Sequence, residues 1–161
     1  MKTSHILTTL LFVAGTAFAD GDKAYELLRE ADQVAKEDAV KASEMYSAAA
    51  DLYGNALKGD PENGNYKKNQ EYCYGKSALV LILRADDLVK EEKQKEAAAL
   101  YKKGIEIYES LHQRLGSEKW ANNLKYARQN GAKASWAAAI RSKDLAPGFE
   151  LTTLDESSSV K

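Results

Sequence analysis

Apolar residues recur three and four positions apart almost without interruption from Asp20 to Asp144, and this spacing constrains the fold more than any other feature. Side chains at that spacing lie on one face of an α-helix, whereas a half-buried strand would require strict alternation. A single proline, Pro61, interrupts the stretch. We therefore predict an all-α fold of antiparallel helical hairpins, with about five helices at residues 23–36, 38–58, 66–89, 92–115 and 118–141.

The predicted helices are separated by residues that stop or cap a helix. The turn at 59–64 contains Pro61, which cannot continue a helix, together with glycine and asparagine, which tolerate turn geometry. Gly116 suits a C-terminal cap. Ser117 stands where an N-cap belongs, so that its hydroxyl can accept from an orphan backbone N–H of the last helix.

Two of the predicted helices resemble each other at an offset of 55 residues: Ala42-x3-Tyr46-x2-Ala49-x3-Tyr53 matches Ala97-x3-Tyr101-x2-Gly104-x3-Tyr108. Because a unit with one apolar face needs a neighbour to cover it, we predict two hairpins followed by one closing helix within residues 20–144. The four tyrosines are expected in the core. Trp120 and Trp136 are expected to seal the final helix onto the bundle.

One segment resembles the second half of a tetratricopeptide repeat: Ala49-x3-Tyr53-x2-Ala56-Leu57-x2-Asp60-Pro61-Glu62-Asn63. Tyr74 fits the following repeat, whereas Glu71 stands where that family prefers a small residue, and the offset exceeds the family's usual period of about 34 residues. The chain is thus similar to tetratricopeptide proteins without being a standard array. The chain also resembles the microtubule-interacting and trafficking domain, a three-helix module, through Ala42-x3-Tyr46 and residues 84–88. From this resemblance we infer only a similar helical architecture and not a similar function.

Residues 1–19 have the pattern of a signal peptide. Lys2 precedes an apolar run from Ile6 to Ala14, and Ala17-Phe18-Ala19 forms a small-x-small cleavage site. The run is too short for a comfortable membrane span of about 20 apolar residues. We predict cleavage after Ala19, a periplasmic or secreted location, and no stable membrane anchor in the mature protein.

Residues 145–161 differ from the rest, because the helical period stops after Lys143. The segment Ala146-Pro147-x-Phe149-x-Leu151-x2-Leu154-Asp155 resembles the entry strand of exported thioredoxin-like thiol-disulfide oxidoreductases. Gly148 and Glu156 depart from that pattern, and no Cys-x-x-Cys follows before Lys161. Either the segment begins a thioredoxin-like domain beyond this chain, or it is a disordered tail.

Few residues have the chemistry that a catalyst requires. The single cysteine, Cys73, is expected to be a buried hydrophobe, and His112 to lie on the surface. A Cys73–His112 pair would need tertiary proximity and a third, orienting group. We find no metal-ligand spacing, no phosphate-binding glycine loop and no cofactor motif. A net charge of -1 with interleaved signs gives no reason to expect nucleic-acid binding.

Extending the tetratricopeptide resemblance from Pro61 would place one face of the third helix in a concave groove. Lysine and asparagine there would grip a peptide backbone or carboxylate, and tyrosine would cover its side chains. A solvated face is the alternative. The candidate partner-binding residues are Asn65, Lys68, Asn69, Tyr72 and Lys76.

The sequence thus predicts an exported interaction or scaffold module that binds a protein or peptide partner and performs no catalysis of its own. The alternative is the N-terminal helical part of a periplasmic thioredoxin-like oxidoreductase, as residues 145–155 suggest. A small-ligand-binding bundle is a third hypothesis.

Overall fold

The computed structural model describes residues 4–116 and 118–142, and over these ranges the chain is helical, with short turns and no strand, as predicted. The helices follow one another in the order α1 (Ser4–Val34), α2 (Ala39–Gly59), α3 (Gly64–Lys90), α4 (Gln94–Leu115), the 3-10 turn η1 (Glu118–Trp120) and α5 (Ala121–Ser142).

The helix ends are set by capping residues. Asp38 is the N-cap of α2, where its carboxylate accepts from the backbone N–H of Lys41 at 2.9 Å. The Asn63 side chain accepts from the first N–H groups of α3, so α3 starts at Gly64, two residues earlier than predicted. Gly116 ends α4 in the left-handed conformation at φ 60°, as its place after the periodic segment indicated.

Helix α1 begins at Ser4 and runs unbroken to Val34, so the predicted helix start at residue 23 was too late. No proline lies within its range, and alanine and leucine, which are abundant there, favour the helix. The predicted cleavage after Ala19 stays a prediction. The proposed Ser117 cap and the tail at 145–161 lie outside the described residues.

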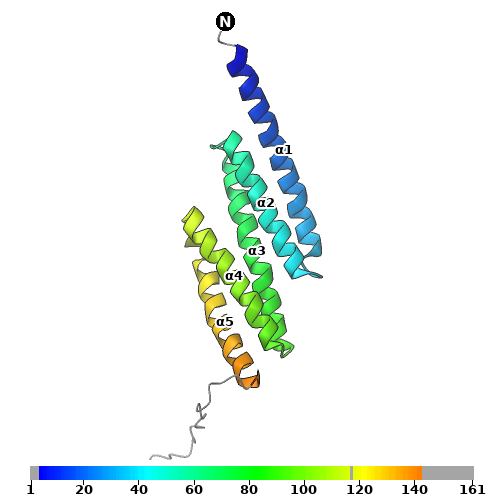
Figure 1. The fold of residues 1–161 in the computed structure, drawn as a ribbon, viewed down its shortest axis with the longest axis vertical. Coiled ribbons are helices and arrows are strands. Elements are labelled where there is room, and N and C mark those ends of the chain that lie inside the picture. Colours follow the sequence, from blue (N-terminus) through cyan, green and yellow to red (C-terminus); the bar gives the residue numbers. More distant parts are fainter. Residues whose placement is uncertain (1–3, 117, 143–161) are drawn as a thin grey trace, which may run out of the picture.

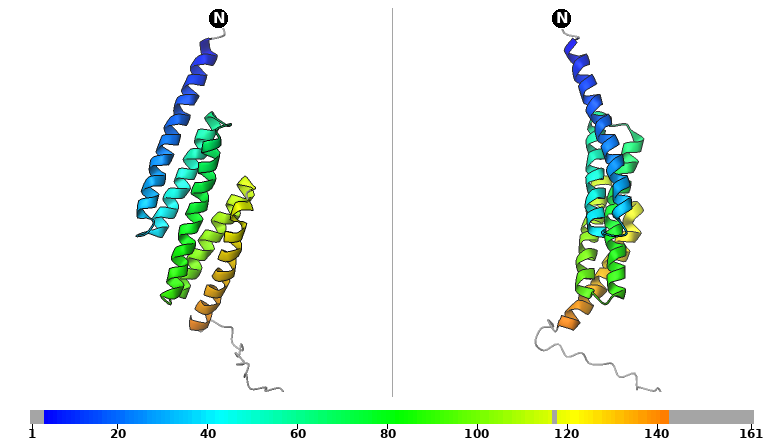
Figure 2. Two further views of the ribbon diagram at one scale, coloured as in Figure 1. Left: turned by 180° about the vertical axis from the view of Figure 1, so that it is seen from behind. Right: turned by 90° about the vertical axis from the view of Figure 1, so that its right-hand side faces the viewer.

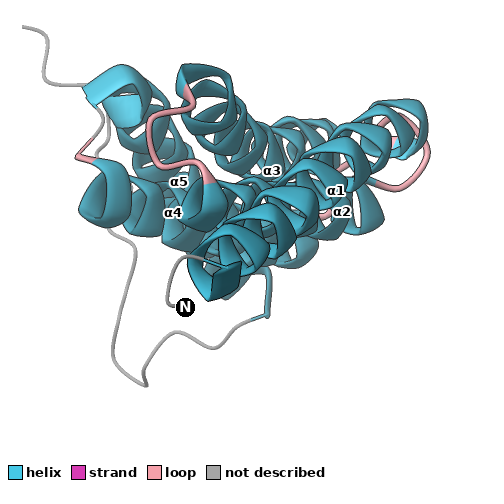
Figure 3. Cartoon of the chain, turned by 90° about the horizontal axis from the view of Figure 1, so that it is seen from above, coloured by secondary structure: helices cyan, strands magenta, loops and turns pink. Residues whose placement is uncertain are grey.

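The helices lie in chain order across the molecule, each packed against the next (Figure 1; Figure 2). Seen end-on, α1 and α5 occupy opposite ends of this arrangement (Figure 3). The first turns of α1 extend beyond the end of α2. The described residues therefore form two helical hairpins, α1–α2 and α3–α4, followed by the single helix α5.

The predicted core tyrosines are confirmed as core, because Tyr46, Tyr53, Tyr101 and Tyr108 are at most 2% exposed. Cys73 is fully buried, also as predicted. The prediction for Trp136 was wrong, because its side chain is 49% exposed. Helix α5 buries a stripe of small residues, namely Ala127, Gly131 and Ala134. At about 100° per residue, Trp136 lies on the opposite side of α5.

Close contacts at glycine reveal an internal repeat that the helix resemblance did not include. A Cβ added at Gly21 would lie 2.6 Å from the Tyr66 hydroxyl, and one added at Gly75 would lie 2.2 Å from the Trp120 ring. Gly75 follows Gly21 by 54 residues, and Trp120 follows Tyr66 by the same interval. In both places an aromatic side chain covers a glycine of an earlier helix: Tyr66, in the first turn of α3, covers Gly21 of α1, and Trp120, in η1 directly before α5, covers Gly75 of α3.

Candidate interaction groove

A groove of about 580 Å³ lies between α2 and α4, with α3 as its floor. Its apolar surface comes from Val40, Leu81, Ile107 and Leu111. Charged and polar side chains stand around this surface on both flanking helices: Glu44, Ser47, Asp51, Lys103, Glu106, Ser110 and Arg114. An apolar floor with polar walls is the usual composition of a site that takes up apolar side chains and orients them by a few polar contacts.

Three serines join α2 to α3 beside the groove: Ser43 and Ser47 line its α2 wall, and Ser77 lies buried behind them on α3. The Ser77 hydroxyl donates to the backbone carbonyl of Ser43 at 2.8 Å and also lies 2.9 Å from the Ser43 hydroxyl and 2.8 Å from that of Ser47. Ser77 is fully buried and Ser43 is 5% exposed. Small side chains let α2 approach α3 closely at this point, and their mutual hydrogen bonds offset the cost of burying hydroxyl groups.

Tyr74 closes one end of the groove between opposite charges. Its hydroxyl donates to Asp51 at 2.5 Å and accepts from the Arg114 guanidinium at 3.0 Å. The guanidinium also lies 5.9 Å from the centre of the Tyr74 ring. Burial first, and then the hydrogen bond to Asp51, raises the pKa of Tyr74 to about 12. This phenol keeps its proton at neutral pH and serves as a hydrogen-bonding group.

None of the five residues predicted to line a groove lies in the α2–α4 groove. Asn65 and Lys68 are exposed near the start of α3, and Tyr72 is 40% exposed further along it. Asn69 is half-buried and lies beside the Tyr53 hydroxyl, whose pKa is raised, chiefly by burial.

Lys76, the fifth predicted residue, is held by groups on α1, α2 and α3. Its ammonium lies 3.3 Å from the Asp32 carboxylate, 5.5 Å from the Tyr46 ring centre and 5.9 Å from that of Tyr72. An ammonium in contact with a carboxylate and two aromatic faces stabilises the packing of these helices. Lys76 and Tyr72 are thus brought together on a face of α3 other than the groove floor.

The α2–α4 groove was not predicted from the sequence, because the groove depends on how two helices flank a third. One signal was present: the 55-residue offset identifies α2 and α4 as equivalent helices of a repeat, with one helix between them. Serines at positions 43 and 47, one helical turn apart, were a second sign that this face of α2 is not purely apolar.

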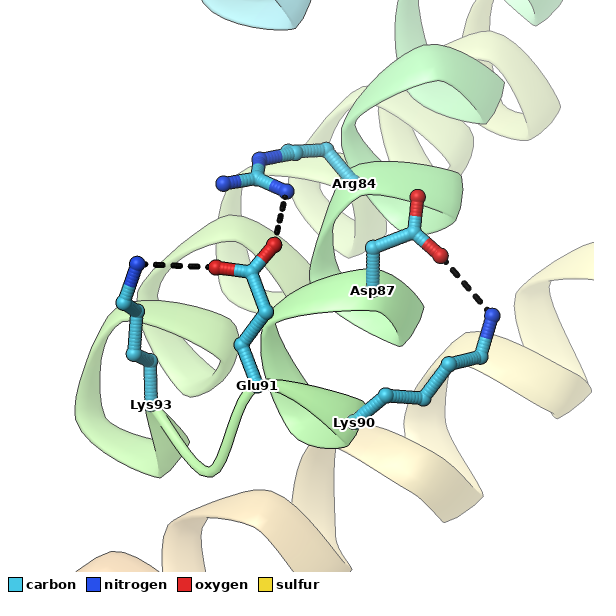
Figure 4. A network of polar contacts seen from close by, with 5 residues as sticks. All are labelled: Arg84, Asp87, Lys90, Glu91 and Lys93. Atoms are coloured by element: carbon cyan, nitrogen blue, oxygen red, sulfur yellow. Dashed lines mark hydrogen bonds and ion pairs between the residues drawn. The ribbon is translucent and has the colours of Figure 1, made fainter.

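A network of charged side chains fixes the turn between α3 and α4 (Figure 4). Glu91 accepts from Arg84 at 2.7 Å and from Lys93 at 2.8 Å, and Lys90 bonds to Asp87 at 2.8 Å. These bonds, that from Arg84 foremost, lower the pKa of Glu91 to about 2. All five groups are at the surface, so we assign the network to the geometry of the turn rather than to a binding site.

The structure keeps Cys73 and His112 in different surroundings. Cys73 packs with Ala24, Ala49 and Tyr53, and burial raises the pKa of its thiol to about 12. His112 is exposed on α4, where it lines a surface pocket together with Trp120. A thiol that is buried and protonated does not have the character of a nucleophile.

No protein-family model, curated protein or solved structure matches this chain. Among the described residues, no cluster of three or more histidine, cysteine, aspartate or glutamate side chains is arranged to hold a metal ion. Within the same residues, no helix is both long and apolar enough to span a membrane.

Proposed function

We propose that this chain is an exported, tetratricopeptide-like interaction module that holds a peptide segment of a partner protein in the α2–α4 groove. The observation that carries the proposal is the groove itself, with its apolar surface and with charges of both signs on its walls, at Glu44, Lys103, Glu106 and Arg114. Such a surface complements an extended segment that alternates apolar and charged side chains.

The surroundings of the groove support a binding role. Helices α2 and α4 are both anchored on α3 by buried tyrosines and small residues, so the groove walls belong to packed helices and not to loops. A preformed groove pays little ordering entropy on binding, which favours affinity for a short segment.

The test is a peptide selection against the full chain, followed by binding measurements with two arginine variants. Ala48 is exposed on the wall of the groove, so Ala48→Arg would place a long charged side chain across it. Ala121 is also exposed but lies at the start of α5, outside the groove, and Ala121→Arg is the matched control. We expect Ala48→Arg to weaken the selected peptide at least about tenfold and the control to leave its affinity unchanged. Equal affinities for both variants and the parent chain would refute the groove as the binding site.

A second candidate function is that of a recruiting arm for a thioredoxin-like oxidoreductase. It rests on the sequence pattern from Ala146 to Asp155, which lies outside the described residues. In that case the α2–α4 groove would present a substrate to a redox domain encoded downstream. Sequencing the locus beyond Lys161 decides the matter: a strand followed by Cys-x-x-Cys supports this function, and a stop codon after Lys161 refutes it.

A further inference from the structure

Helix α5 has one long face that no other described helix covers. It packs against α4 and touches α3 and η1, and it lies at the outer end of the helix row (Figure 1). Ala132 and Trp136 are exposed on this face, and Ala139 and Ile140 are half-buried beside them. Between this face and α4 lies a second groove of about 570 Å³.

The internal repeat shows what kind of element fits this face. Trp136 follows Ile82 by 54 residues, and Ala132 follows Ala78 by the same interval. In α3 those equivalent residues are buried under α4, with the Ile82 side chain so close to Gly104 that an added Cβ would lie 2.5 Å from it. The outer face of α5 therefore corresponds to a surface that is covered by a helix one repeat earlier.

The charge of α5 identifies the chemistry of the covering helix. The helix carries Lys125, Arg128, Lys133 and Arg141 and contains no aspartate or glutamate. Arg128 pairs with Glu109 at 2.8 Å and Arg141 with Glu92 at 3.4 Å, whereas Lys125 and Lys133 are exposed, Lys125 at the rim of a pocket between α4 and α5. Pairing α5 with α5 of a second copy would bring lysines together, which is unfavourable. An acidic helix would complement them.

We propose that the outer face of α5 binds an acidic amphipathic helix of a partner protein, seated on α5 as α4 is seated on α3. The helix presents a glycine or alanine to Trp136, because the larger indole occupies the position that Ile82 holds opposite Gly104. Its carboxylates lie on the side of this small residue that faces the start of α5, where they reach Lys133 and Lys125. This surface is separate from the α2–α4 groove, so either proposal stands or falls without the other.

The probe is a synthetic peptide with the sequence of α4 in which Lys95→Glu, Lys102→Glu and Lys103→Glu replace basic by acidic side chains. The unmodified α4 peptide, which keeps Gly104, is the charge control. Binding to the full chain is followed by anisotropy of the labelled peptide and by tryptophan emission. We expect the acidic peptide to bind at least about tenfold more tightly than the control at low salt, to lose this advantage as salt is raised, and to shift the emission of Trp136 to the blue.

Variants of the chain connect the binding to α5. Trp136→Ala should weaken the acidic peptide by about thirtyfold, whereas Trp136→Phe should retain most of the affinity. A double variant with Lys125→Glu and Lys133→Glu should lose the preference for the acidic peptide. The control is a double variant with Lys41→Glu and Lys67→Glu, two lysines that are exposed on other helices, and it should keep that preference. Circular dichroism verifies that each variant keeps its helices.

Three results would overturn the proposal. The first is equal binding of both peptides, or binding that Trp136→Ala leaves unchanged. The second is a concentration-dependent dimer that Trp136→Ala abolishes, because a second copy would then cover the face. The third is a shift of Trp136 emission when residues 143–161 are deleted, because the chain's own C-terminal segment would then be the occupant.

Discussion

The Tyr101 hydroxyl of α4 donates a hydrogen bond to the Asp86 carboxylate of α3, and the same contact recurs one hairpin earlier between Tyr46 and Asp32. Each aspartate also contacts a side chain on the next helix after that of the tyrosine. Asp86 accepts from the Tyr126 hydroxyl at 3.0 Å, and Asp32 lies 3.3 Å from the Lys76 ammonium. One carboxylate therefore links three successive helices in each half of the repeat.

Tyr101→Phe should lower the free energy of unfolding by about 2 kcal/mol, because it removes a hydrogen bond to a charged group that is partly buried. Tyr25→Phe is the matched control, since Tyr25 is 55% exposed and the change should be nearly neutral. Urea unfolding of both variants measures the difference. A loss for Tyr101→Phe no greater than that of the control would contradict a stabilising role for the Tyr101–Asp86 contact.

The same contacts predict a loss of stability at alkaline pH. Burial, and then the hydrogen bond and charge of Asp32, raise the pKa of Tyr46, and burial followed by Asp86 does the same for Tyr101. The folded pKa values lie above the unfolded value of about 10, so the folded chain keeps protons that the unfolded chain releases. The resulting stability is fully present below about pH 10 and is lost as pH rises toward the folded pKa values.

We therefore expect the free energy of unfolding to fall steeply above about pH 10, and to fall less in a Tyr46→Phe, Tyr101→Phe double variant. Urea unfolding at a series of pH values provides the measurement. Tyrosinate absorbance of the folded chain is an independent check: if Tyr46 and Tyr101 ionised near their ordinary value, the predicted pH dependence would have no basis.

Gly75→Ala should destabilise the fold although alanine is the better helix former. The new Cβ would lie 2.2 Å from the Trp120 ring, and such overpacking costs about 1–3 kcal/mol against a gain of about 1 kcal/mol in helix propensity. Gly64→Ala is the control, because nothing lies within 4 Å of its added Cβ, and it should be neutral or stabilising. Thermal unfolding compares the two variants.

A second-site change tests the cause of that loss. In a Trp120→Leu background the ring that blocks the new methyl group is absent, so Gly75→Ala should cost much less than in the parent chain. If Gly75→Ala costs as much in both backgrounds, the close approach of Trp120 is not what requires glycine at this position.

The helical periodicity and the helix breakers predicted most of the fold. The predicted helices at residues 38–58 and 92–115 agree closely with the observed bounds of α2 and α4. The 55-residue offset identified the four tyrosines that are buried. Trp136 was misplaced because periodicity does not tell whether a neighbour covers a given face of α5. The α2–α4 groove was not predicted because it depends on the spacing of two helices on α3, which is a tertiary property.

Cys73 should resist alkylation by iodoacetamide at neutral pH, because the side chain is fully buried and burial raises the pKa of its thiol to about 12. Mass spectrometry after brief treatment should show an unmodified native chain and a modified chain in urea. Rapid modification of the folded chain would show that the thiol is accessible and would contradict the burial of Cys73.

Backbone NMR of the isotopically labelled chain, titrated with the selected peptide, locates the binding site residue by residue. We expect the largest chemical-shift changes at Ser47, Ala48, Lys103 and Ser110, which line the α2–α4 groove. Changes centred instead on Asn65, Lys68 and Tyr72 of α3, with the α2–α4 groove unaffected, would show that the peptide does not bind in the groove.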